Sequence, residues 1–331
     1  MPTQSIMHPT NIDVVIPCYQ VRQHVNAVVR ECLAQAFIRN VIVVDDACPQ
    51  DSAAAVESEF SAVDRVIVIR HASNQGVGGA MVSGYRHAFE HGAEIAVKVD
   101  GDGQMPPDRI ARLVAPILRK QADYTKGNRF YSPQHLSGMP AMRLFGNAML
   151  SLINKFSSGY WSIIDPTNGF TALSRTAYLQ LDTGKLERRY FFESDMLYQL
   201  GIVNAVVEDV PMPAVYNGEP SSLNIYHVAV EFPPKYLKRF VKRIGFRYFL
   251  REFNIASLEI LLGVPAMLAG LVFGIYQWTI HTERDELTPA GTTMIVGLLI
   301  LMGFQMILSA INYDVVHEPD RPLTQRDDST L

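Results

Sequence analysis

Two long stretches near the C-terminus of this 331-residue chain contain no charged residue, and they constrain its fold more than any other feature. The first runs from Ile260 to Ile280 and the second from Thr288 to Tyr313. A helix needs roughly 20 apolar residues to cross a bilayer, and both stretches are that long. Tyr276, Trp278 and Tyr313 lie near their ends, where interfacial aromatic residues are favoured. The sequence therefore predicts a hairpin of two transmembrane helices.

A strongly basic segment precedes the first apolar stretch. It contains no acidic residue and seven basic ones, namely Lys235, Lys238, Arg239, Lys242, Arg243, Arg247 and Arg251. Their helical spacing is typical of an amphipathic helix on an anionic membrane surface, with a solvated basic face as the plainer alternative. The loop between the apolar stretches has only Arg284 as a basic residue, against three acidic ones. The positive-inside rule then predicts a multi-pass protein of the inner (cytoplasmic) membrane with its N-terminal domain in the cytosol.

The N-terminal part alternates apolar β-branched runs with segments of helical spacing. Buried strands are expected at residues 11–17, 41–44, 66–70, 95–99 and 203–210. The alternation predicts an α/β fold with a mostly parallel, Rossmann-like sheet. We expect four parts in the chain: an α/β catalytic domain at 1–225, a basic amphipathic juxtamembrane segment at 226–254, two transmembrane helices at 255–315, and a cytosolic tail at 316–331.

Acidic residues follow two of the predicted strands. Asp45 and Asp46 close the second strand, and Asp100 and Asp102 follow the fourth. Ligands of parallel sheets bind outside the carboxyl ends of the strands, so these residues are candidates for a binding site. Two carboxylates and the amide of Gln104 suit Mg²⁺ or Mn²⁺ bridging a diphosphate, whereas solvated loop acids are the plainer reading. For Asp46, hydrogen bonds to a base or ribose compete with a turn or helix cap.

Some classes of function are disfavoured by the sequence. The formal net charge of −4 argues against nucleic acid as the main partner. The glycines of Asn74–Ala80 (NQGVGGA) follow the third strand rather than the first, and Met81 stands where a dinucleotide fingerprint needs its third glycine. We interpret that segment as a turn that lets a helix pack closely on the sheet.

Six motifs occur in a fixed order along the chain. They are Val15–Gln20 (VIPCYQ), Val43–Asp46 (VVDD), Asn74–Gly76 (NQG), Asp100–Pro107 (DGDGQMPP), Gly127–Phe130 (GNRF) and Asp165–Phe170 (DPTNGF). This series resembles the GT-A glycosyltransferases of family 2, and within them the polyprenyl-phosphate and dolichyl-phosphate hexose synthases. The resemblance covers about residues 11–225, and a two-helix anchor matches the bacterial members.

The resemblance implies a set of roles for the residues that match. The nucleotide-sugar pocket would comprise Pro17, Tyr19, Asp46, Asp100 and Asp102. The diphosphate and a Mg²⁺ or Mn²⁺ ion would be held by Asp100, Asp102 and Gln104. The acceptor phosphate would be gripped by Arg129 and Arg143, for which an ordinary surface ion pair is the alternative. Asp195 would be the late acidic residue near the sugar, with Glu193 as a close competitor. Asp165 is expected to shape a tight loop.

The implied activity is inverting transfer of one hexose from a nucleotide-sugar, by analogy a UDP-hexose, to polyprenyl (undecaprenyl) phosphate. A homo-oligomer, by analogy a tetramer, is expected. Three alternatives remain. A processive polysaccharide synthase would need a Q-x-x-R-W signature, which neither Trp161 nor Trp278 provides. Transfer to a protein or a soluble glycan would not explain the basic segment, whereas a lipid acceptor other than polyprenyl phosphate stays open. A non-catalytic membrane scaffold would not explain the intact Asp-x-Asp set.

Overall fold

The computed structural model describes residues 10–131, 141–212 and 225–327, with side chains for 10–131, 145–212 and 230–326. The chain divides into two compact units, one formed by residues 1–240 with 319–331 and the other by residues 241–318. The strands of the first unit are β1 (Ile12–Cys18), β2 (Ile38–Asp45), β3 (Val66–Arg70), β4 (Ile95–Lys98), β5 (Tyr124–Asn128), β6 (Thr171–Ser174) and β7 (Val207–Pro211). Its helices are α1 (Val25–Leu33), α2 (Ser52–Phe60), α3 (Val77–Glu90), α4 (Ile110–Leu118), α6 (Ala141–Ser158), α7 (Arg175–Gln180), α8 (Phe192–Ile202), most of α9 (Ile225–Ile244) and α12 (Leu323–Asp327).

The seven strands form one mixed, mostly parallel sheet in the order β3-β2-β1-β4-β6-β5-β7. β6 runs antiparallel to both of its neighbours, β4 and β5, whereas every other pairing is parallel. Six strands therefore share one direction, and their carboxyl ends meet at one edge of the sheet. Because β6 runs the other way, its first residue lies at that same edge.

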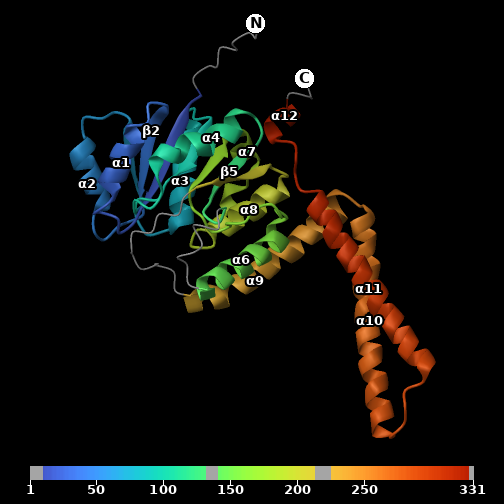
Figure 1. Ribbon diagram of the computed structural model, residues 1–331. Coiled ribbons are helices and arrows are strands. Elements are labelled where there is room, and N and C mark those ends of the chain that lie inside the picture. The colour runs from blue at the N-terminus through green and yellow to red at the C-terminus, as the bar shows by residue number, and fades with distance from the viewer. Residues whose placement is uncertain (1–9, 132–140, 213–224, 328–331) are drawn as a thin grey trace. The chain divides into compact units, whose positions relative to one another are not determined.

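Both faces of the sheet are buried (Figure 1). Val15 of β1 packs into a core with residues of α3, α7 and α8, whereas its neighbours Val14 and Ile16 pack into a second core with residues of α1, α2 and α4. Successive side chains of a strand point to opposite faces, which explains why these strands are continuously apolar. The predicted α/β, GT-A-like fold is confirmed.

Strands β5 and β6 are not predicted by the sequence analysis. Lys126 and Asn128 of β5 and Thr171 of β6 are buried, so both strands carry polar side chains in the interior. The predicted turn at Asn74–Ala80 does lead into α3, and Gly84 of that helix permits close packing on the sheet. A Cβ atom at Gly84 would lie 2.2 Å from Cγ1 of Val15.

The basic segment is helical in α9, but some of its charge is already paired. Arg239 binds Asp195 and Glu187, each at 2.9 Å, and Lys235 lies 3.4 Å from Glu187. The same helix packs through Phe232 onto α6 and Phe191. Lys235 and Arg239 therefore attach α9 to the rest of the first unit, in addition to any role at a membrane.

The C-terminal residues do not form a separate tail. The side chain of Leu323 is buried in the core that includes α7, and its N–H donates to both carboxylate oxygens of Asp123, at 2.9 and 3.0 Å. The Asp123 carboxylate also accepts a hydrogen bond from the N–H of Val206. Residues 319–327 thus complete the first unit, although they follow the second apolar helix in sequence.

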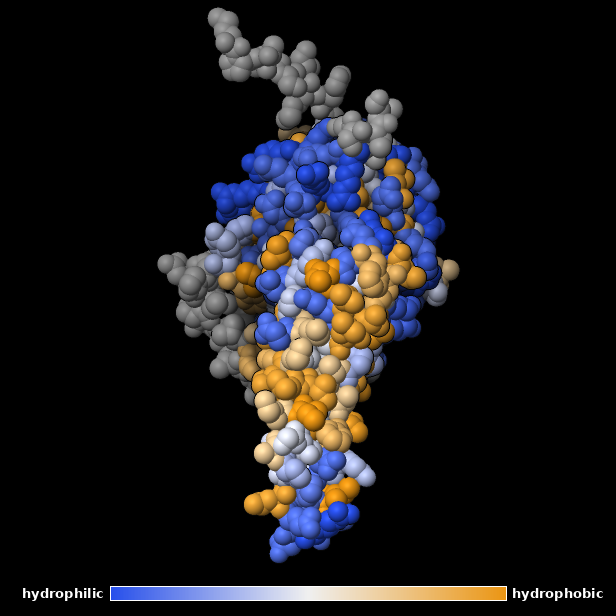
Figure 2. All heavy atoms as spheres, turned by 90° about the vertical axis from the view of Figure 1, so that its right-hand side faces the viewer, coloured by the Kyte–Doolittle hydropathy of each residue, from blue (hydrophilic) through white to orange (hydrophobic). Residues whose placement is uncertain are grey.

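The second unit consists of the end of α9, a π-helical turn (Gly245–Arg251) and two long helices, α10 (Ile255–Glu283) and α11 (Ala290–Val316). α10 and α11 lie side by side (Figure 1). They approach closely, because a Cβ atom at Gly303 would lie 2.6 Å from the backbone nitrogen of Met267. Both helices are long and apolar enough to cross a membrane, and only 11% of the most apolar window of each is buried. Figure 2 shows apolar residues over the outer surface of this hairpin and hydrophilic residues at its tip.

A buried ionic cluster joins the two ends of the second unit. Arg243 is 2% exposed and donates to both oxygens of Asp314, at 2.8 and 2.9 Å. The Tyr248 hydroxyl donates to the same carboxylate, and Arg247 lies 3.5 Å from it. Fixed donors on both oxygens offset the cost of burying the Asp314 carboxylate. These contacts connect the end of α9 and the π-helical turn to the end of α11.

Candidate active site

A cleft of about 120 Å³ opens where the loops after β4 and β5 meet the loop that leads into β6. Its lining residues are Asp100, Asp102, Gln104, Met105, Arg129, Thr167, Asn168, Gly169 and Met212. All three loops lie at the carboxyl edge of the parallel strands, where ligands of such sheets bind. The cleft therefore gathers predicted residues that are up to 29 positions apart in the sequence, from Asp100 to Arg129.

The loop after β4 brings Asp100, Asp102 and Gln104 into this cleft together. Gly103 has a positive φ of 77°, which glycine adopts readily, and the Gln104 N–H donates to Oδ1 of Asp102 at 3.0 Å. Carboxylate and amide oxygens are the ligands that Mg²⁺ and Mn²⁺ prefer, so this donor set fits a divalent cation. Among the described residues no group of three or more His, Cys, Asp or Glu is arranged to hold a metal ion, so a cation held by this donor set would need further ligands from a substrate or from water.

Lys98, the last residue of β4, is a buried cation that the sequence analysis missed. Its Nζ lies 2.8 Å from Oδ1 of Asp100 and 3.0 Å from Oε1 of Glu193. Burial opposes the charged form of Lys98, but the two carboxylates outweigh burial and hold its pKa above the ordinary value. A lysine inside an otherwise apolar strand is the sequence signal that could have found it.

The two candidates for the late acidic residue have different surroundings. Glu193 lies in the first turn of α8 and is joined to Asp100 through Lys98. Asp195 is fully buried, with Oδ1 bound to Arg239 and Oδ2 accepting the N–H of Glu187. Burial raises the pKa of Asp195, and Arg239 opposes this rise. The contacts of Asp195 thus hold α8 and α9 together, whereas Glu193 adjoins the Asp-x-Asp loop.

Arg129 is held by the predicted loop residue Asp165. Nε and Nη2 of Arg129 donate to the two carboxylate oxygens of Asp165, at 2.8 and 3.1 Å. Asp165 is fully buried, whereas the Arg129 side chain is 32% exposed and lines the cleft. A bidentate pair fixes the plane of the guanidinium group, so Arg129 is a pre-oriented cation rather than a member of a loose surface pair.

Arg143, the second predicted acceptor residue, lies in the first turn of α6, the helix Ala141–Ser158. Its side chain lies outside the described residues. Its assignment to the acceptor phosphate therefore stays a prediction.

The loop before β6 is shaped by buried polar contacts. The side-chain amide of Asn168 donates to the carbonyl of Gly127 at 2.7 Å, and its side-chain oxygen accepts the N–H of Phe170. The buried Lys126 donates from Nζ to the carbonyl of Asn168. Burial lowers the pKa of Lys126 to about 8, although Glu193 and Asp165 counteract this effect. Asn168 and Lys126 thus fix the loop across the end of β5.

The predicted nucleotide residues Pro17, Tyr19 and Asp46 lie outside the lining of this cleft. Tyr19 is 44% exposed in the loop after β1. Asp46 is buried, and its oxygens accept the N–H groups of Gln75 and Gly76 at 2.8 and 2.7 Å. The carboxylate of Asp46 therefore holds the turn into α3, as in the second of its two sequence interpretations.

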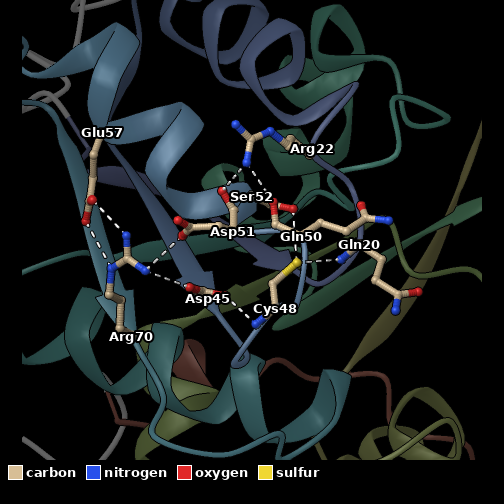
Figure 3. Close-up of polar contacts among 9 residues, drawn as sticks. All are labelled: Gln20, Arg22, Asp45, Cys48, Gln50, Asp51, Ser52, Glu57 and Arg70. Atoms are coloured by element: carbon tan, nitrogen blue, oxygen red, sulfur yellow. Dashed lines mark hydrogen bonds and ion pairs between the residues drawn. The ribbon is translucent and has the colours of Figure 1, made fainter.

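Polar contacts cross-link the loops after β1 and β2 and the last residue of β3, Arg70 (Figure 3). The thiol of Cys48 accepts the N–H of Gln20 at 3.0 Å and contacts the Ser52 hydroxyl at 3.1 Å. Burial disfavours the thiolate, but these hydrogen bonds outweigh burial and lower the pKa of Cys48. Arg70 pairs with Asp45 and with residues of the α2 region. This network fixes the loop that carries Tyr19.

The sheet order and the acidic residues at the strand ends agree with the fold that the sequence motifs predict. A model of glycosyl transferase family 2 matches residues 13–181, more than half of the chain, and the chain belongs to that family.

Curated relatives include three enzymes that act on lipid phosphates. The chain is 31% identical over 218 residues to UDP-N-acetylglucosamine–dolichyl-phosphate N-acetylglucosaminyltransferase of Methanococcus voltae, covering 62% of this chain and 86% of the relative. It is 26% identical over 201 residues to polyprenol monophosphomannose synthase of Mycolicibacterium smegmatis, covering 60% and 75%. It is 26% identical over 177 residues to undecaprenyl-phosphate mannosyltransferase of Micrococcus luteus, covering 53% and 72%.

Solved structures share the fold. Mannosyl-3-phosphoglycerate synthase of Rubrobacter xylanophilus superposes with a TM-score of 0.53 at 16% identity, covering 74% of this chain and 77% of that one. Glucosyl-3-phosphoglycerate synthase of Mycobacterium tuberculosis, crystallised with Mn²⁺, UDP-glucose and phosphoglyceric acid, gives 0.51 at 16% identity, covering 71% and 80%. At such identities the likeness shows the fold alone.

Proposed function

We propose that this glycosyltransferase moves one hexose from a nucleotide-sugar, a UDP-hexose, to polyprenyl (undecaprenyl) phosphate at the cytosolic face of the inner membrane. The observation that carries the proposal is the single cleft that joins Asp100, Asp102 and Gln104 to the oriented Arg129. Relatives that act on dolichyl, polyprenol and undecaprenyl phosphates support the acceptor class. The apolar hairpin supports an acceptor that is itself in a membrane.

The acceptor side of the mechanism depends on arginine. A lipid phosphate is already an anion at neutral pH, so it needs no general base to act as a nucleophile. The enzyme must instead overcome repulsion between that anion and the donor diphosphate. Arg129, fixed by the buried Asp165, supplies a permanent positive charge suited to phosphate, and we propose that Arg143 supplies a second. With the acceptor held in line, the phosphate oxygen attacks the anomeric carbon with inversion.

The donor side depends on oxygen ligands. We propose that Asp100, Asp102 and Gln104 hold Mg²⁺ or Mn²⁺, which when bound offsets the charge that develops on the leaving diphosphate. The exposed Tyr19, two residues after Pro17, would face the base. Asp46 would act on the nucleotide indirectly, because its oxygens hold the turn into α3.

For the acidic residue near the sugar we propose Glu193 rather than Asp195. Glu193 is joined to Asp100 through Lys98, and its side chain is 13% exposed. Asp195 has both oxygens engaged by Arg239 and by the N–H of Glu187.

The hairpin supports the proposed membrane arrangement. Residues 1–240 and 319–331 belong to the same compact unit, which supports an even number of membrane crossings. Lys238 and Lys242 are exposed, and they favour the cytosolic side. The homo-oligomer, by analogy a tetramer, stays a prediction for native mass spectrometry. Gly263 and Gly303, which could have served contacts between copies, pack α10 against α11.

The test is a donor screen with the full-length protein in liposomes that contain undecaprenyl phosphate. UDP-glucose, UDP-galactose, UDP-N-acetylglucosamine and GDP-mannose are each supplied with Mn²⁺, and products are identified by mass. The expected product is undecaprenyl phosphate carrying one sugar. Undecaprenol without phosphate serves as the matched acceptor control and should stay unmodified. Transfer to a phosphate-free acceptor, or products with several sugars, would overturn the proposal.

A further inference from the structure

Lys98 presents a problem of buried charge next to the cleft. It is 1% exposed, at the end of a central strand that is covered on both faces. A buried ammonium group is costly unless anions surround it, and Lys98 has two, Asp100 at 2.8 Å and Glu193 at 3.0 Å. Lys98 therefore forms ion pairs with two carboxylates from different elements, one in the loop after β4 and one in the first turn of α8.

The loop before β6 closes over this pair. A Cβ atom at Gly169 would lie 2.3 Å from Nζ of Lys98 and 2.8 Å from Oδ2 of Asp100. A side chain at this position would displace the Lys98 ammonium group or the Asp100 carboxylate, so the backbone of the loop covers the Lys98–Asp100 contact directly. The Asp100 carboxylate thus contacts the ammonium group of Lys98 and lies close to the backbone of Gly169, and both limit its position.

The other polar groups near Lys98 do not replace its charge. Tyr85 and Tyr124 are fully buried, and burial raises the pKa of Tyr85 to about 12, so it stays neutral. Lys126, on the next strand but one, donates to the carbonyl of Asn168 rather than to Asp100 or Glu193. Without Lys98 the two carboxylates would repel each other across a site of low polarity.

We propose that Lys98 is a positioning residue: it fixes the carboxylate of Asp100 for the divalent cation and the donor diphosphate, and it holds Glu193 beside them. The inference rests on the proposed function only in taking Asp100 as part of the cation site. It assigns a role to a residue that touches neither donor nor acceptor. It also explains why an otherwise apolar buried strand ends in a lysine.

The test measures binding rather than turnover. Full-length Lys98→Met is titrated with Mn²⁺ in the presence of UDP, and free Mn²⁺ is followed by electron paramagnetic resonance. We expect Mn²⁺ binding to weaken by about tenfold or more, as for loss of a residue that orients a metal ligand. Binding within twofold of the wild type would overturn the proposal. If the wild type binds GDP rather than UDP, GDP replaces UDP as the probe, and only the choice of donor has failed.

A second variant separates charge from packing. Lys98→Met/Glu193→Gln removes one anion together with the cation and so restores the net charge of the cluster. If Lys98 acts by neutralising and placing the carboxylates, the double variant recovers at least about threefold of the lost Mn²⁺ affinity, as an interaction between neighbouring residues. If Lys98 only fills space, Glu193→Gln recovers nothing, and the proposal fails.

A control corrects for lost stability. Asp123→Asn removes a different buried charge, at the start of β5 and in contact with Leu323. We expect it to lower the melting temperature and leave Mn²⁺ binding in the presence of UDP unchanged. Should Lys98→Met fail to fold, the comparison of Glu193→Gln with the double variant decides instead. The proposal then requires the double variant to bind Mn²⁺ more weakly than Glu193→Gln, and equal binding overturns it.

Discussion

Two pairs of acidic residues lie at the same edge of the sheet, but their surroundings differ. Asp45 and Asp46 follow β2 and are buried, and their oxygens are taken by backbone N–H groups, His71 and Arg70. Asp100 and Asp102 follow β4 and line an open cleft. Position at a strand end is therefore insufficient to define a ligand site. What distinguishes the two pairs is exposure to the cleft, because Asp45 and Asp46 are buried whereas the side chain of Asp100 is 30% exposed although it pairs with Lys98.

The largest expected effect comes from the open pair. Asp102→Asn removes the charge of a proposed cation ligand and should lower glycosyl transfer by at least about 100-fold, while the fold is retained. Transfer is measured with the active donor and undecaprenyl phosphate, with EDTA-treated wild type as a parallel. Asp108→Asn, in the exposed turn that follows, is the matched control. Full activity of Asp102→Asn, or of the EDTA-treated enzyme, would contradict the cation assignment.

The arginines should give the next largest effect. Arg129→Ala leaves the buried Asp165 without its partner and the acceptor without its cation, so we expect transfer to fall by about 100-fold. Arg143→Ala should also reduce transfer, mainly by raising the KM for the lipid phosphate. Arg109→Ala serves as a control, because Arg109 pairs only weakly with Asp108, at 3.4 Å. Near-normal activity in both Arg129→Ala and Arg143→Ala would remove the acceptor role.

Substitutions in the buried pair, Asp45 and Asp46, should lower the stability of the fold more than the rate of glycosyl transfer. Asp46→Ala leaves the N–H groups of Gln75 and Gly76 without their acceptor, which should cost about 1–3 kcal/mol of unfolding free energy. Thermal unfolding in detergent measures the loss, and the rate per folded molecule should fall less than in Asp102→Asn. A variant of unchanged stability that has lost donor binding would instead make Asp46 a direct nucleotide ligand.

The smallest effect concerns a third carboxylate. Burial raises the pKa of Asp209 to about 6 from its ordinary 3.8, although the N–H of Ile164 opposes this rise. An acid whose pKa is raised by folding destabilises the folded state once it ionises, so this contribution is absent below about pH 4 and fully developed above about pH 6.

The measurement is the difference in melting temperature between Asp209→Asn and the wild type. That difference should become more favourable to the variant between pH 4.5 and pH 7, by an amount equivalent to about 2 kcal/mol. A difference that does not change with pH would show that Asp209 is ionised throughout.

Whether a strand could be predicted from the sequence depended on whether its buried side chains are apolar or polar. β1 to β4 could be predicted because strands buried on both faces are apolar along their whole length, as in Val41 to Val44. β5 and β6 could not, because Lys126, Asn128 and Thr171 are polar side chains buried by tertiary contacts. The Asp-x-Asp loop and Arg129 were predicted from motifs, and the structure brings them into one cleft. Lys98 was missed because the anion that pairs with it from α8, Glu193, is 95 residues away.

The basic segment shows a second limit of local pattern. Its helical spacing predicts a membrane-facing surface, and α9 is indeed a helix. Arg239 and Arg243, however, bind Asp195 and Asp314, which are distant in sequence. A charge pattern reports which residues need partners, whereas the sequence does not say whether those partners are lipids or distant acids.

The packing of Leu323 constrains the order in which parts of this protein can fold during synthesis. The core that Leu323 enters lies in the first unit, but the ribosome reaches Leu323 only after it has translated α10 and α11. During synthesis the catalytic unit therefore lacks part of its core until both apolar helices have emerged. Until then Asp123 lacks the N–H of Leu323. The first unit can therefore be completed only after the hairpin has been synthesised.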